Sequence, residues 1–254
     1  MEKSEIEKYA NLASETARTA GLRLAGISGR RINSDAGNDV KLQEDVESEE
    51  FIRNILAPTG IPVVGEEKGG DSSLMESDSL YWIVDPIDGS YNFLRGMRGV
   101  CVSIALMRGM KPIVGAIYDF TCDELFCGGS GLPLTLNGRP IKPSWASEIR
   151  QAVLMTGFPS ATDYSDSNLG KFVLAVQNFK KVRMVGSACV AISWVACGRA
   201  DAYYEDRLYL WDVAAGLSLI ESAGGVYEIH RIKLEGKPFC IGIRAAAKRE
   251  FIIA

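Results

Sequence analysis

A short apolar run that ends in two aspartates is the feature that most constrains the fold of this chain. Residues 80–84 (LYWIV) have the composition and length of a buried β-strand, and Asp85-Pro86-Ile87-Asp88-Gly89-Ser90 follows them directly. Proline and glycine favour a turn, so we expect the strand to stop at Asp85-Pro86. Two carboxylates three residues apart can then converge on one point beyond the strand end. A plain turn is an equally good interpretation of this segment taken alone.

Patterns on either side of this segment predict a layered α+β fold with mixed sheets. Between two predicted helices, residues 26–39 are rich in Gly, Ser and Asn, which indicates a mobile loop. Helices are expected over the first 25 residues and at 44–56, 169–179, 188–196 and 212–222. Strands are expected at 63–64, 80–84, 101–107, 112–118, 124–127, 153–156, 183–185, 202–205, 226–229 and 239–243. An irregular stretch at 140–147 indicates a subdomain boundary.

Composition excludes several classes of function. The chain has 28 Lys and Arg against 32 Asp and Glu, which gives no electrostatic basis for binding nucleic acid. No apolar run approaches the roughly 18 residues that span a membrane, and the N-terminus does not resemble a signal peptide. The six cysteines form no CxxC pair and lie mostly in apolar stretches, as reduced and buried thiols of a cytoplasmic protein do. We therefore expect a cytoplasmic protein that binds neither nucleic acid nor membrane.

A single histidine, His230, limits the chemistry further. One histidine disfavours most histidine-based chemistry: Ser-His-Asp hydrolases, Cys-His proteases and zinc enzymes with several histidine ligands. Carboxylates must carry any catalysis. His230 itself lies in a polar stretch after a predicted strand, where a surface position is expected.

The DPIDGS segment combines carboxylates with a possible anion site. Gly89 and Ser90 present backbone N–H groups where a helix could begin, and such groups bind anions. Neighbouring carboxylates would repel a phosphate unless divalent cations lay between them, and Mg²⁺ prefers such oxygen ligands. Glu66-Glu67 follows another strand end, and Asp212 opens a predicted helix. Alone these residues indicate a solvated pair and an N-cap, but their occurrence together favours a metal site.

Three separated motifs resemble those of the inositol monophosphatase family, the lithium-sensitive, Mg²⁺-dependent sugar phosphatases. The family motif D-P-[IL]-D-G-[ST] matches residues 85–90, W-D-x-A-[AG]-[AG] matches 211–216, and the upstream G-E-E matches 65–67. Further similarity lies at 185–188 (VGSA) and 200–205 (ADAYYE). The resemblance implies a layered α/β/α/β/α sandwich with two mixed sheets, of the sugar-phosphatase type, and a homodimer. Its N-terminal α+β subdomain, 1–145, would carry GEE and DPIDGS, and its C-terminal α/β subdomain, 146–254, would carry WDVAAG and the sugar contacts.

The resemblance also assigns roles to the acidic residues. A first Mg²⁺ would be held by Glu66, Asp85 and the Ile87 carbonyl, and a second by Asp85, Asp88 and Asp212. Glu67 and Asp88 would lie near a third, weaker metal, which gives two or three Mg²⁺ per site. The loop at 29–37 differs from the family pattern, and we expect it to be a mobile lid that contributes to this third site. Catalytic roles fall to Ser90, Asp45, Glu66 and Glu67.

Ser90 would stand beside the attacking water, and Asp45 matches the acidic partner of that hydroxyl. A Ser–Asp pair can orient water and accept its proton without a histidine. Substrate contacts are implied at Asp88, Gly89, Ser90, Arg183, Gly186, Ser187, Ala188, Glu205, Arg207 and Asp212. Among them, Glu205 matches a residue that binds inositol in animal enzymes. Arg183 and Arg207 are similar to arginines that hold the substrate in archaeal members, and surface charges are the alternative interpretation.

The expected reaction is in-line attack of water on a phosphomonoester. Inositol-1-phosphate is the preferred substrate, with fructose-1,6-bisphosphate as a second. The alternatives are a dedicated fructose-1,6-bisphosphatase and a phosphatase for an adenosine bisphosphate or NADP. A non-catalytic sensor of metal or phosphate is the alternative outside enzymes. A sensor would not need the full set of Glu66, Asp85, Asp88, Ser90 and Asp212.

Overall fold

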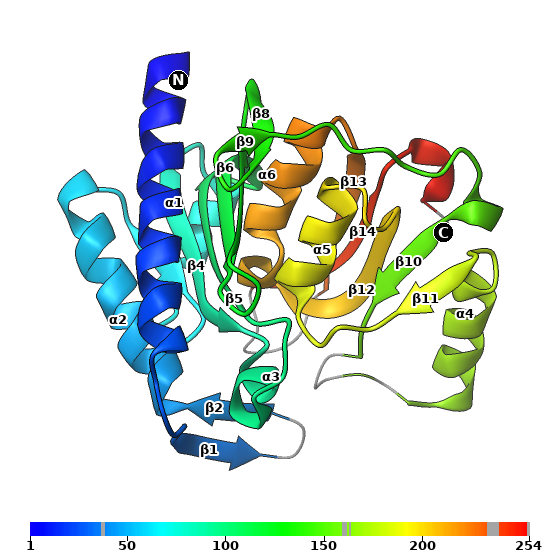
Figure 1. Cartoon of the computed structure of the whole chain (residues 1–254), viewed down its shortest axis with the longest axis horizontal. Helices are drawn as coiled ribbons and strands as arrows, with labels where there is room; N and C mark the ends of the chain where they lie inside the picture. The colour runs from blue at the N-terminus through cyan, green and yellow to red at the C-terminus, as the bar shows by residue number, and fades with distance from the viewer. Residues whose placement is uncertain (37–38, 159–161, 163, 233–238, 253–254) are drawn as a thin grey trace.

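Five layers of helices and sheets make up the fold. The computed structural model describes residues 1–36, 39–158, 162, 164–232 and 239–252. Figure 1 shows the layers from left to right: helices α1 (Lys3–Ala25) and α2 (Gln43–Leu56), a seven-stranded sheet, helices α5 (Ala188–Ala196) and α6 (Ala214–Ala223), a five-stranded sheet, and helix α4 (Asp166–Val176). This arrangement confirms the predicted layered α/β/α/β/α sandwich with two mixed sheets. Among the described residues, no helix is both long and apolar enough to cross a membrane.

The seven-stranded sheet carries the DPIDGS segment. Helices α1 (Lys3–Ala25) and α2 (Gln43–Leu56) cover its outer face. In sheet order its strands are β3 (Val63–Gly65), β4 (Leu80–Asp88), β5 (Cys101–Arg108), β6 (Lys111–Asp119), β7 (Glu124–Gly129), β8 (Leu132–Leu136) and β9 (Arg139–Pro140). β3 runs parallel to β4, and the other neighbours are antiparallel. Helix α3 (Ser90–Arg95) follows β4 directly.

The five-stranded sheet has the order β11 (Lys181–Arg183), β10 (Val153–Thr156), β12 (Ala202–Tyr209), β14 (Cys240–Ala246) and β13 (Val226–Arg231). β10 is parallel to both β11 and β12, and β14 is antiparallel to its neighbours. Helix α4 (Asp166–Val176) connects β10 to β11 on the outer face, and α5 (Ala188–Ala196) connects β11 to β12 on the inner face. Ligands bind where such connections diverge, beyond the carboxyl ends of the strands.

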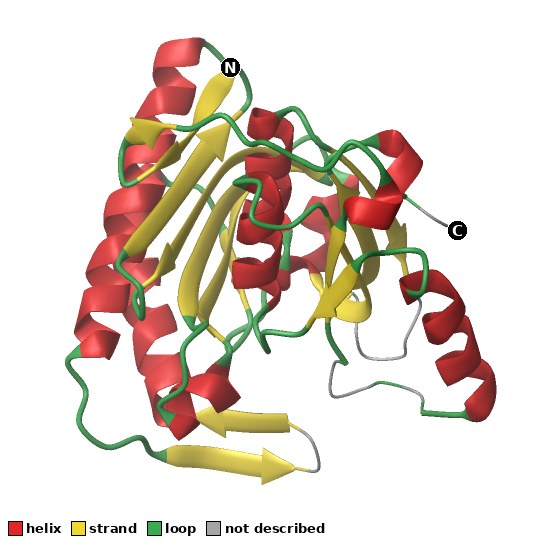
Figure 2. Cartoon of the chain, turned by 45° about the vertical axis from the view of Figure 1, so that its right-hand side comes forward, coloured by secondary structure: helices red, strands yellow, loops and turns green. Residues whose placement is uncertain are grey.

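Apolar residues fill the spaces between these layers. The central strands are buried on both faces: Trp82 packs toward α1, and Ile83 packs toward the middle helices α5 and α6 (Ala214–Ala223). This double burial explains why residues 80–84 read as a continuous apolar run rather than an alternating one. Figure 2, turned by 45°, shows the two middle helices between the sheets. Trp82, Tyr118 and Phe126 are buried, as core residues should be.

Several local expectations were wrong. The loop predicted at 26–39 contains a hairpin of β1 (Ile32–Ala36) and β2 (Asp39–Leu42), while Gly37 lies outside the described residues. A two-stranded ribbon forms through backbone pairing, and strands of five and four residues are too short to give a clear alternating pattern. The strand predicted at 183–185 lies instead at Lys181–Arg183. The helix predicted at 212–222 begins at Ala214, because Asp212 ends a separate 3-10 helix, Leu210–Asp212.

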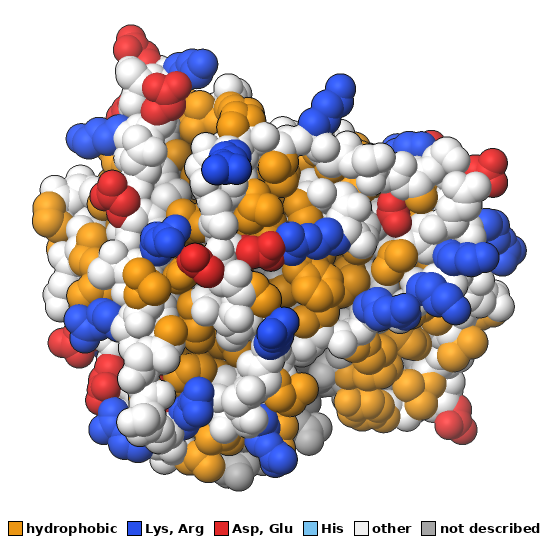
Figure 3. All heavy atoms as spheres, in the orientation of Figure 1, with side chains coloured by type: hydrophobic (Ala, Val, Ile, Leu, Met, Phe, Trp, Pro, Cys, Tyr) orange, Lys and Arg blue, Asp and Glu red, His pale blue; other side chains and the backbone are white. Residues whose placement is uncertain are grey.

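The chain passes from the first sheet to the second between Pro140 and Val153. The division into subdomains 1–145 and 146–254 stays a prediction, since the helices α5 and α6 lie between the two sheets. Helix α4, in contrast, is an outermost element with no buried residue. Figure 3 shows apolar side chains gathered over this side of the molecule, where Val173, Leu174 and Met184 are exposed.

Candidate active site

Acidic side chains from both halves of the chain converge at one edge of the middle layer. Because β3 and β4 are parallel, their carboxyl ends meet at the same edge of the first sheet. The starts of α2, α5 and α6 and the end of β12 approach the same place. Seven carboxylates lie in this group, each close enough to affect the ionisation of another: Asp45, Glu66, Glu67, Asp85, Asp88, Glu205 and Asp212.

A β-bulge brings Asp85 and Asp88 together. Residues three apart on a regular strand point to opposite faces of the sheet. In β4, however, Asp85 pairs with Ser103 and Asp88 pairs with Cys101. An advance of three residues along β4 therefore corresponds to an advance of only two along β5. The extra residue shifts the register and lets both carboxylates face the same site. The strand therefore does not stop at Asp85-Pro86, as the sequence predicted, but continues through the bulge to Asp88.

Burial and mutual repulsion disfavour the charged forms of these groups. Burial raises the pKa of Glu66 well above its usual value, and the negative charges of Asp212 and Asp45 raise it further. The pKa of Asp85 is likewise raised by burial and by neighbouring carboxylates. Lys41 opposes the effect, with its Nζ 2.9 Å from Glu67 Oε1. Such a cluster can be fully ionised only when cations lie among its members.

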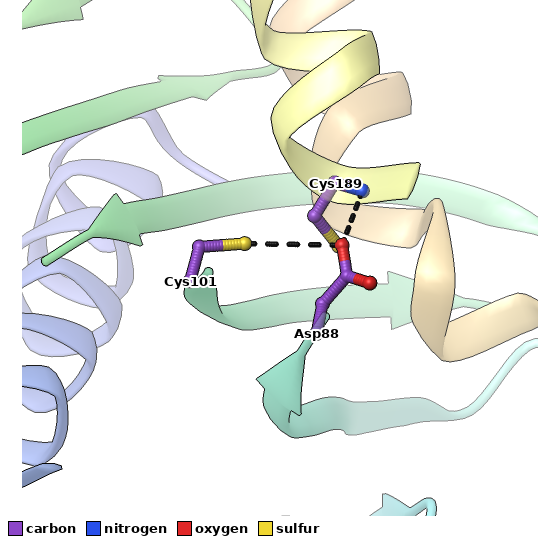
Figure 4. A group of neighbouring side chains, drawn as sticks. All are labelled: Asp88, Cys101 and Cys189. Carbon is purple, nitrogen blue, oxygen red and sulfur yellow. Dashed lines mark hydrogen bonds between the residues drawn. The ribbon is translucent and has the colours of Figure 1, made fainter. Parts of the chain in front are cut away.

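Asp88 is held by the start of α5. Its Oδ2 accepts hydrogen bonds from the Cys189 N–H at 2.5 Å and from the Ser187 hydroxyl at 2.7 Å. The thiol of Cys101 approaches the same oxygen at 3.9 Å. Figure 4 shows this oxygen turned toward the two cysteines and the other oxygen turned away from them. Ser187, expected as a substrate contact, thus fixes the orientation of Asp88.

Ser90 and Asp45 form a direct pair beside the cluster. The Ser90 hydroxyl lies 3.0 Å from Asp45 Oδ1 and 2.8 Å from the Ile87 carbonyl oxygen, both of which can accept its hydrogen bond. Asp45 Oδ2 also accepts the Leu42 N–H at 2.8 Å, at the start of α2. Burial raises the pKa of Asp45 to about 7, although these hydrogen bonds oppose the shift. The geometry therefore confirms the predicted proximity of the two residues, while their catalytic roles stay a prediction.

A glycine is required where β4 turns into α3. Gly89 has a φ of +88°, and a Cβ there would lie 2.7 Å from the Gly99 carbonyl oxygen. A larger residue would be strained in both respects. The turn places Ser90 at the first position of α3, within reach of Asp45.

Glu49 is a positioning residue that sequence analysis missed. Glu49 is fully buried in α2. Its carboxylate accepts hydrogen bonds from the backbone N–H groups of Glu67, at 2.7 Å, and Lys68, at 3.2 Å. It also forms an ion pair with Arg53 at 2.7 Å. The contact is possible because residue 65 is glycine: the Cβ of any other residue there would lie 2.5 Å from this carboxylate. The available signal was spacing: Glu49 shares the buried face of its helix with Ile52 and Leu56.

We expect Glu49→Gln to lower the apparent affinity for Mg²⁺ more than it lowers the maximal rate. The amide presents N–H groups where a second acceptor oxygen is needed, so the GEE turn should loosen. Hydrogen bonds to charged groups contribute about 1.5–3 kcal/mol each, so the free energy of unfolding should fall by a similar amount. Activity titrated against Mg²⁺ should give a higher half-saturating concentration. Glu50→Gln is the control, since that carboxylate is exposed; an equal effect in both variants would remove the positioning role.

A cavity of about 340 Å³ adjoins the cluster between α4 and the ends of β10 and β12. Glu205 and Arg207 both contribute to its wall. Burial raises the pKa of Glu205 to about 8, with a smaller contribution from the charge of Asp88, while the hydrogen bond from the Tyr203 hydroxyl at 2.8 Å lowers it. Arg207 has a φ of +64° at a bulge between Asp206 and Leu208. This bulge in β12 places Arg207 in the wall of the cavity.

The remaining expected substrate contacts are placed differently. Arg183 is exposed, its guanidinium donates to the Val182 carbonyl, and it is not among the described residues of the cavity wall. Gly186 and Ala188 flank Ser187 just before and at the start of α5, beside Asp88 rather than in the described cavity wall. His230 is an exposed residue whose Nε2 lies 3.1 Å from Asp206 Oδ1.

Comparisons with known proteins give this geometry a context. The model of the inositol monophosphatase family matches residues 5–243. The chain belongs to this family. Inositol monophosphatase 3 of Solanum lycopersicum is 36% identical over 228 residues, which cover 87% of this chain and 85% of that protein. A fructose-1,6-bisphosphatase/inositol-1-monophosphatase of Aquifex aeolicus is 33% identical over 241 residues, which cover 92% of this chain and 88% of that protein.

The fold agrees with that assignment. A solved inositol monophosphatase structure from Anabaena (Nostoc) superimposes with a TM-score of 0.80 at 32% identity, and the match covers 97% of this chain and 93% of that one. The family resemblance inferred from the three motifs is therefore confirmed. Inositol monophosphatase family proteins are phosphatases that act on small phosphorylated molecules and depend on a metal, generally Mg²⁺. The oxygen-only donor set of Glu66, Asp85, Asp88 and Asp212 suits that ion.

Proposed function

We propose that this chain is a Mg²⁺-dependent phosphomonoesterase that hydrolyses inositol-1-phosphate and also fructose-1,6-bisphosphate. One observation carries the proposal. The Ser90–Asp45 pair lies beside a buried group of carboxylates from both halves of the chain. A proton acceptor and a cation-binding group are thereby combined in one site, as phosphate ester hydrolysis requires.

The residues divide between holding metal and moving a proton. Glu66, Asp85 and the Ile87 carbonyl would hold one Mg²⁺, and Asp85, Asp88 and Asp212 a second, with Glu67 near a third. Bound Mg²⁺ would neutralise the phosphate, lower the pKa of the attacking water and stabilise the departing alkoxide.

The Ser90 hydroxyl would orient the attacking water and pass its proton to Asp45. Asp45 suits this role because its Oδ1 lies 3.0 Å from the Ser90 hydroxyl, within range to accept the proton. The Gly89 and Ser90 N–H groups, at the start of α3, would bind the phosphate oxygens. Ser187 and the Cys189 N–H keep the Asp88 carboxylate in one orientation throughout.

The cavity beside the cluster would hold the alcohol part of the ester. Glu205 can accept hydrogen bonds from the hydroxyls of inositol. Arg207 can bind a second phosphate with two parallel N–H groups, which a bisphosphate offers and inositol-1-phosphate does not. Both residues border the same cavity, so the two substrates would occupy it in turn.

We expect Arg207→Ala and Glu205→Gln to have opposite substrate preferences. Charge-assisted hydrogen bonds contribute about 1.5–3 kcal/mol, so Arg207→Ala should raise the KM for fructose-1,6-bisphosphate by roughly tenfold or more. Inositol-1-phosphate should be nearly unaffected. Glu205→Gln should weaken the binding of inositol-1-phosphate and leave the binding of the bisphosphate unchanged. The measurement is kcat/KM for both substrates in the wild type and both variants.

Arg183→Ala in the same assay tests whether that exposed arginine contributes at all. Since Arg207 has a left-handed backbone conformation, Arg207→Asn is a useful second variant that tolerates the same φ. Equal losses for both substrates in both Arg207 variants would make this residue structural and remove the support for bisphosphatase activity.

The cavity wall also favours a second candidate substrate class. Phe158 and Phe172, with ring centroids 4.9 Å apart, line it together with Tyr204. Aromatic walls suit a nucleobase, as in an adenosine bisphosphate or NADP. Assays against a panel of sugar phosphates and nucleotides distinguish a phosphatase for such nucleotides from a dedicated fructose-1,6-bisphosphatase. Hydrolysis of para-nitrophenyl phosphate with and without Mg²⁺ separates all of them from a non-catalytic sensor.

A homodimer is part of the proposal. The exposed apolar residues Val173 and Leu174 on α4 support an association surface. Light scattering coupled to size exclusion would give the mass in solution. Lithium inhibition, implied by the resemblance alone, stays a prediction.

A further inference from the structure

Two thiols lie against the carboxylate of Asp88. Cys101 is the cross-strand neighbour of Asp88 at the start of β5, and Cys189 is the second residue of α5. One carboxylate oxygen of Asp88 and the two sulfur atoms all lie within 4.8 Å of one another. Figure 4 shows the three side chains converging from separate elements. Both cysteines are fully buried, while Asp88 is half-buried.

The proposed hydrolysis leaves these thiols without a role. Mg²⁺ prefers oxygen ligands, and sulfur is a poor ligand for it. The sulfur atoms also contact groups of the site rather than only apolar core: Cys189 Sγ lies 3.0 Å from the Asp212 carbonyl oxygen, and Cys101 Sγ lies 3.9 Å from Ser187 Oγ. Soft ligands thus stand directly beside a carboxylate assigned to a hard cation.

We propose that Asp88, Cys101 and Cys189 form a second binding site, for a thiophilic divalent cation such as Zn²⁺ or Cd²⁺, and that its occupation inhibits hydrolysis. Two thiolates and one carboxylate are a donor set that such ions accept, with a water as the fourth ligand. Binding involves no redox step: each sulfur loses its proton to solvent and forms a bond to the cation. Because Asp88 is shared, the cation competes with Mg²⁺.

The geometry requires only small movements. Zn–S bonds of about 2.3 Å in a tetrahedral site put the ligand atoms roughly 3.8 Å apart. The three ligand atoms now lie within 4.8 Å of one another, so no pair is more than about an ångström too far apart. The distance from Cys101 Sγ to Asp88 Oδ2, 3.9 Å, already matches a tetrahedral site. Asp88 is only half-buried, so its carboxylate is accessible to a cation from solvent.

The experiment titrates Cd²⁺ into the full-length protein kept reduced by a phosphine. The ultraviolet charge-transfer band between thiolate and cadmium reports binding directly. The wild type should show a band that saturates at one Cd²⁺ per chain, and Cys101→Ala/Cys189→Ala should lose it. Cys240→Ala, which removes a buried thiol elsewhere in the fold, is the matched control and should keep it.

Inhibition is measured on the same samples. Loss of metal-site interactions costs about 10–100-fold in affinity, so the Cd²⁺ concentration that halves activity should rise at least tenfold in the double variant. Each single variant, checked by thermal melting, replaces the double variant if the latter fails to fold. A band that persists in these variants, or no band in the wild type, would overturn the site.

Inhibition, but not binding, rests on the proposed function. The two can therefore fail separately. A cysteine-dependent band in a protein without Mg²⁺-dependent phosphatase activity would refute the proposed function and leave the site standing. Normal phosphatase activity with Cd²⁺ inhibition unchanged in the double variant would refute the site alone.

Discussion

Replacement of Asp88 by asparagine should lower Mg²⁺-dependent hydrolysis by about 10²–10³-fold, since the variant loses a charge that we propose holds a metal and stabilises the transition state. The geometry makes the amide unsuitable in either orientation. One carboxylate oxygen already accepts both the Cys189 N–H and the Ser187 hydroxyl. If the amide oxygen accepts from those two donors, the NH₂ group of the asparagine points into the carboxylate cluster, where a cation would need an acceptor. In the opposite orientation, the NH₂ group faces the Cys189 N–H, and two donors oppose each other.

Melting temperatures measured with and without Mg²⁺ show whether Asp88→Asn has lost metal binding or has failed to fold. Removing one charge from a cluster of buried carboxylates relieves repulsion, so the metal-free variant should be at least as stable as the metal-free wild type. Mg²⁺ should then raise the melting temperature of the wild type more than that of Asp88→Asn. Asp123→Asn is the matched control, because Asp123 is an exposed surface residue that pairs with Arg18. Full activity of Asp88→Asn at ordinary Mg²⁺ concentrations would show that the cluster is misassigned.

Elements with strong local signals were predictable from the sequence. Helix α5 and strand β10 have the predicted bounds, because an apolar run in each is ended by small or turn-forming residues. The hairpin of β1 and β2 was not, since strands of only five and four residues are too short to give a clear periodic signal. Strand β12 continues four residues beyond its predicted end because β14 pairs along it, which is a long-range cause.

The acidic residues were predictable as a set, but their arrangement was not. Contiguous motifs identified Asp85 and Asp88, yet only a register shift against β5 brings the two to the same side. Asp45 was assigned through family resemblance alone, since nothing in its local sequence indicates a contact with Ser90 some 45 residues away. Glu49 was missed because a glutamate on an amphipathic helix normally indicates the solvated face, whereas here it is buried by Arg53 and the GEE turn.

The substrate side was the least predictable. Arg183 and Arg207 were assigned the same role by resemblance, but one is an exposed residue outside the described cavity wall and the other borders the cavity from a bulge. A bulge depends on the pairing of distant strands, so neither its position nor the direction of Arg207 could be derived from local sequence.

Ser90→Ala should lower kcat by about 10²–10⁴-fold and leave KM nearly unchanged, because acid–base help from a hydroxyl matters chiefly in the transition state. The variant removes the donor that lies 3.0 Å from Asp45 and 2.8 Å from the Ile87 carbonyl. Asp45 keeps its hydrogen bond from the Leu42 N–H, so the carboxylate should stay in place.

Two further variants decide whether the hydroxyl itself is responsible. Ser90→Thr restores the hydroxyl and should recover most of the rate, whereas a purely steric role for Ser90 would make the larger residue worse than alanine. Ser218→Ala removes another buried hydroxyl, on α6 against the Gly128 carbonyl, and should leave kcat unchanged. If Ser90→Ala retains the wild-type kcat, the water must be activated elsewhere, and Glu67 becomes the next candidate because its carboxylate lies in the same cluster beside Lys41.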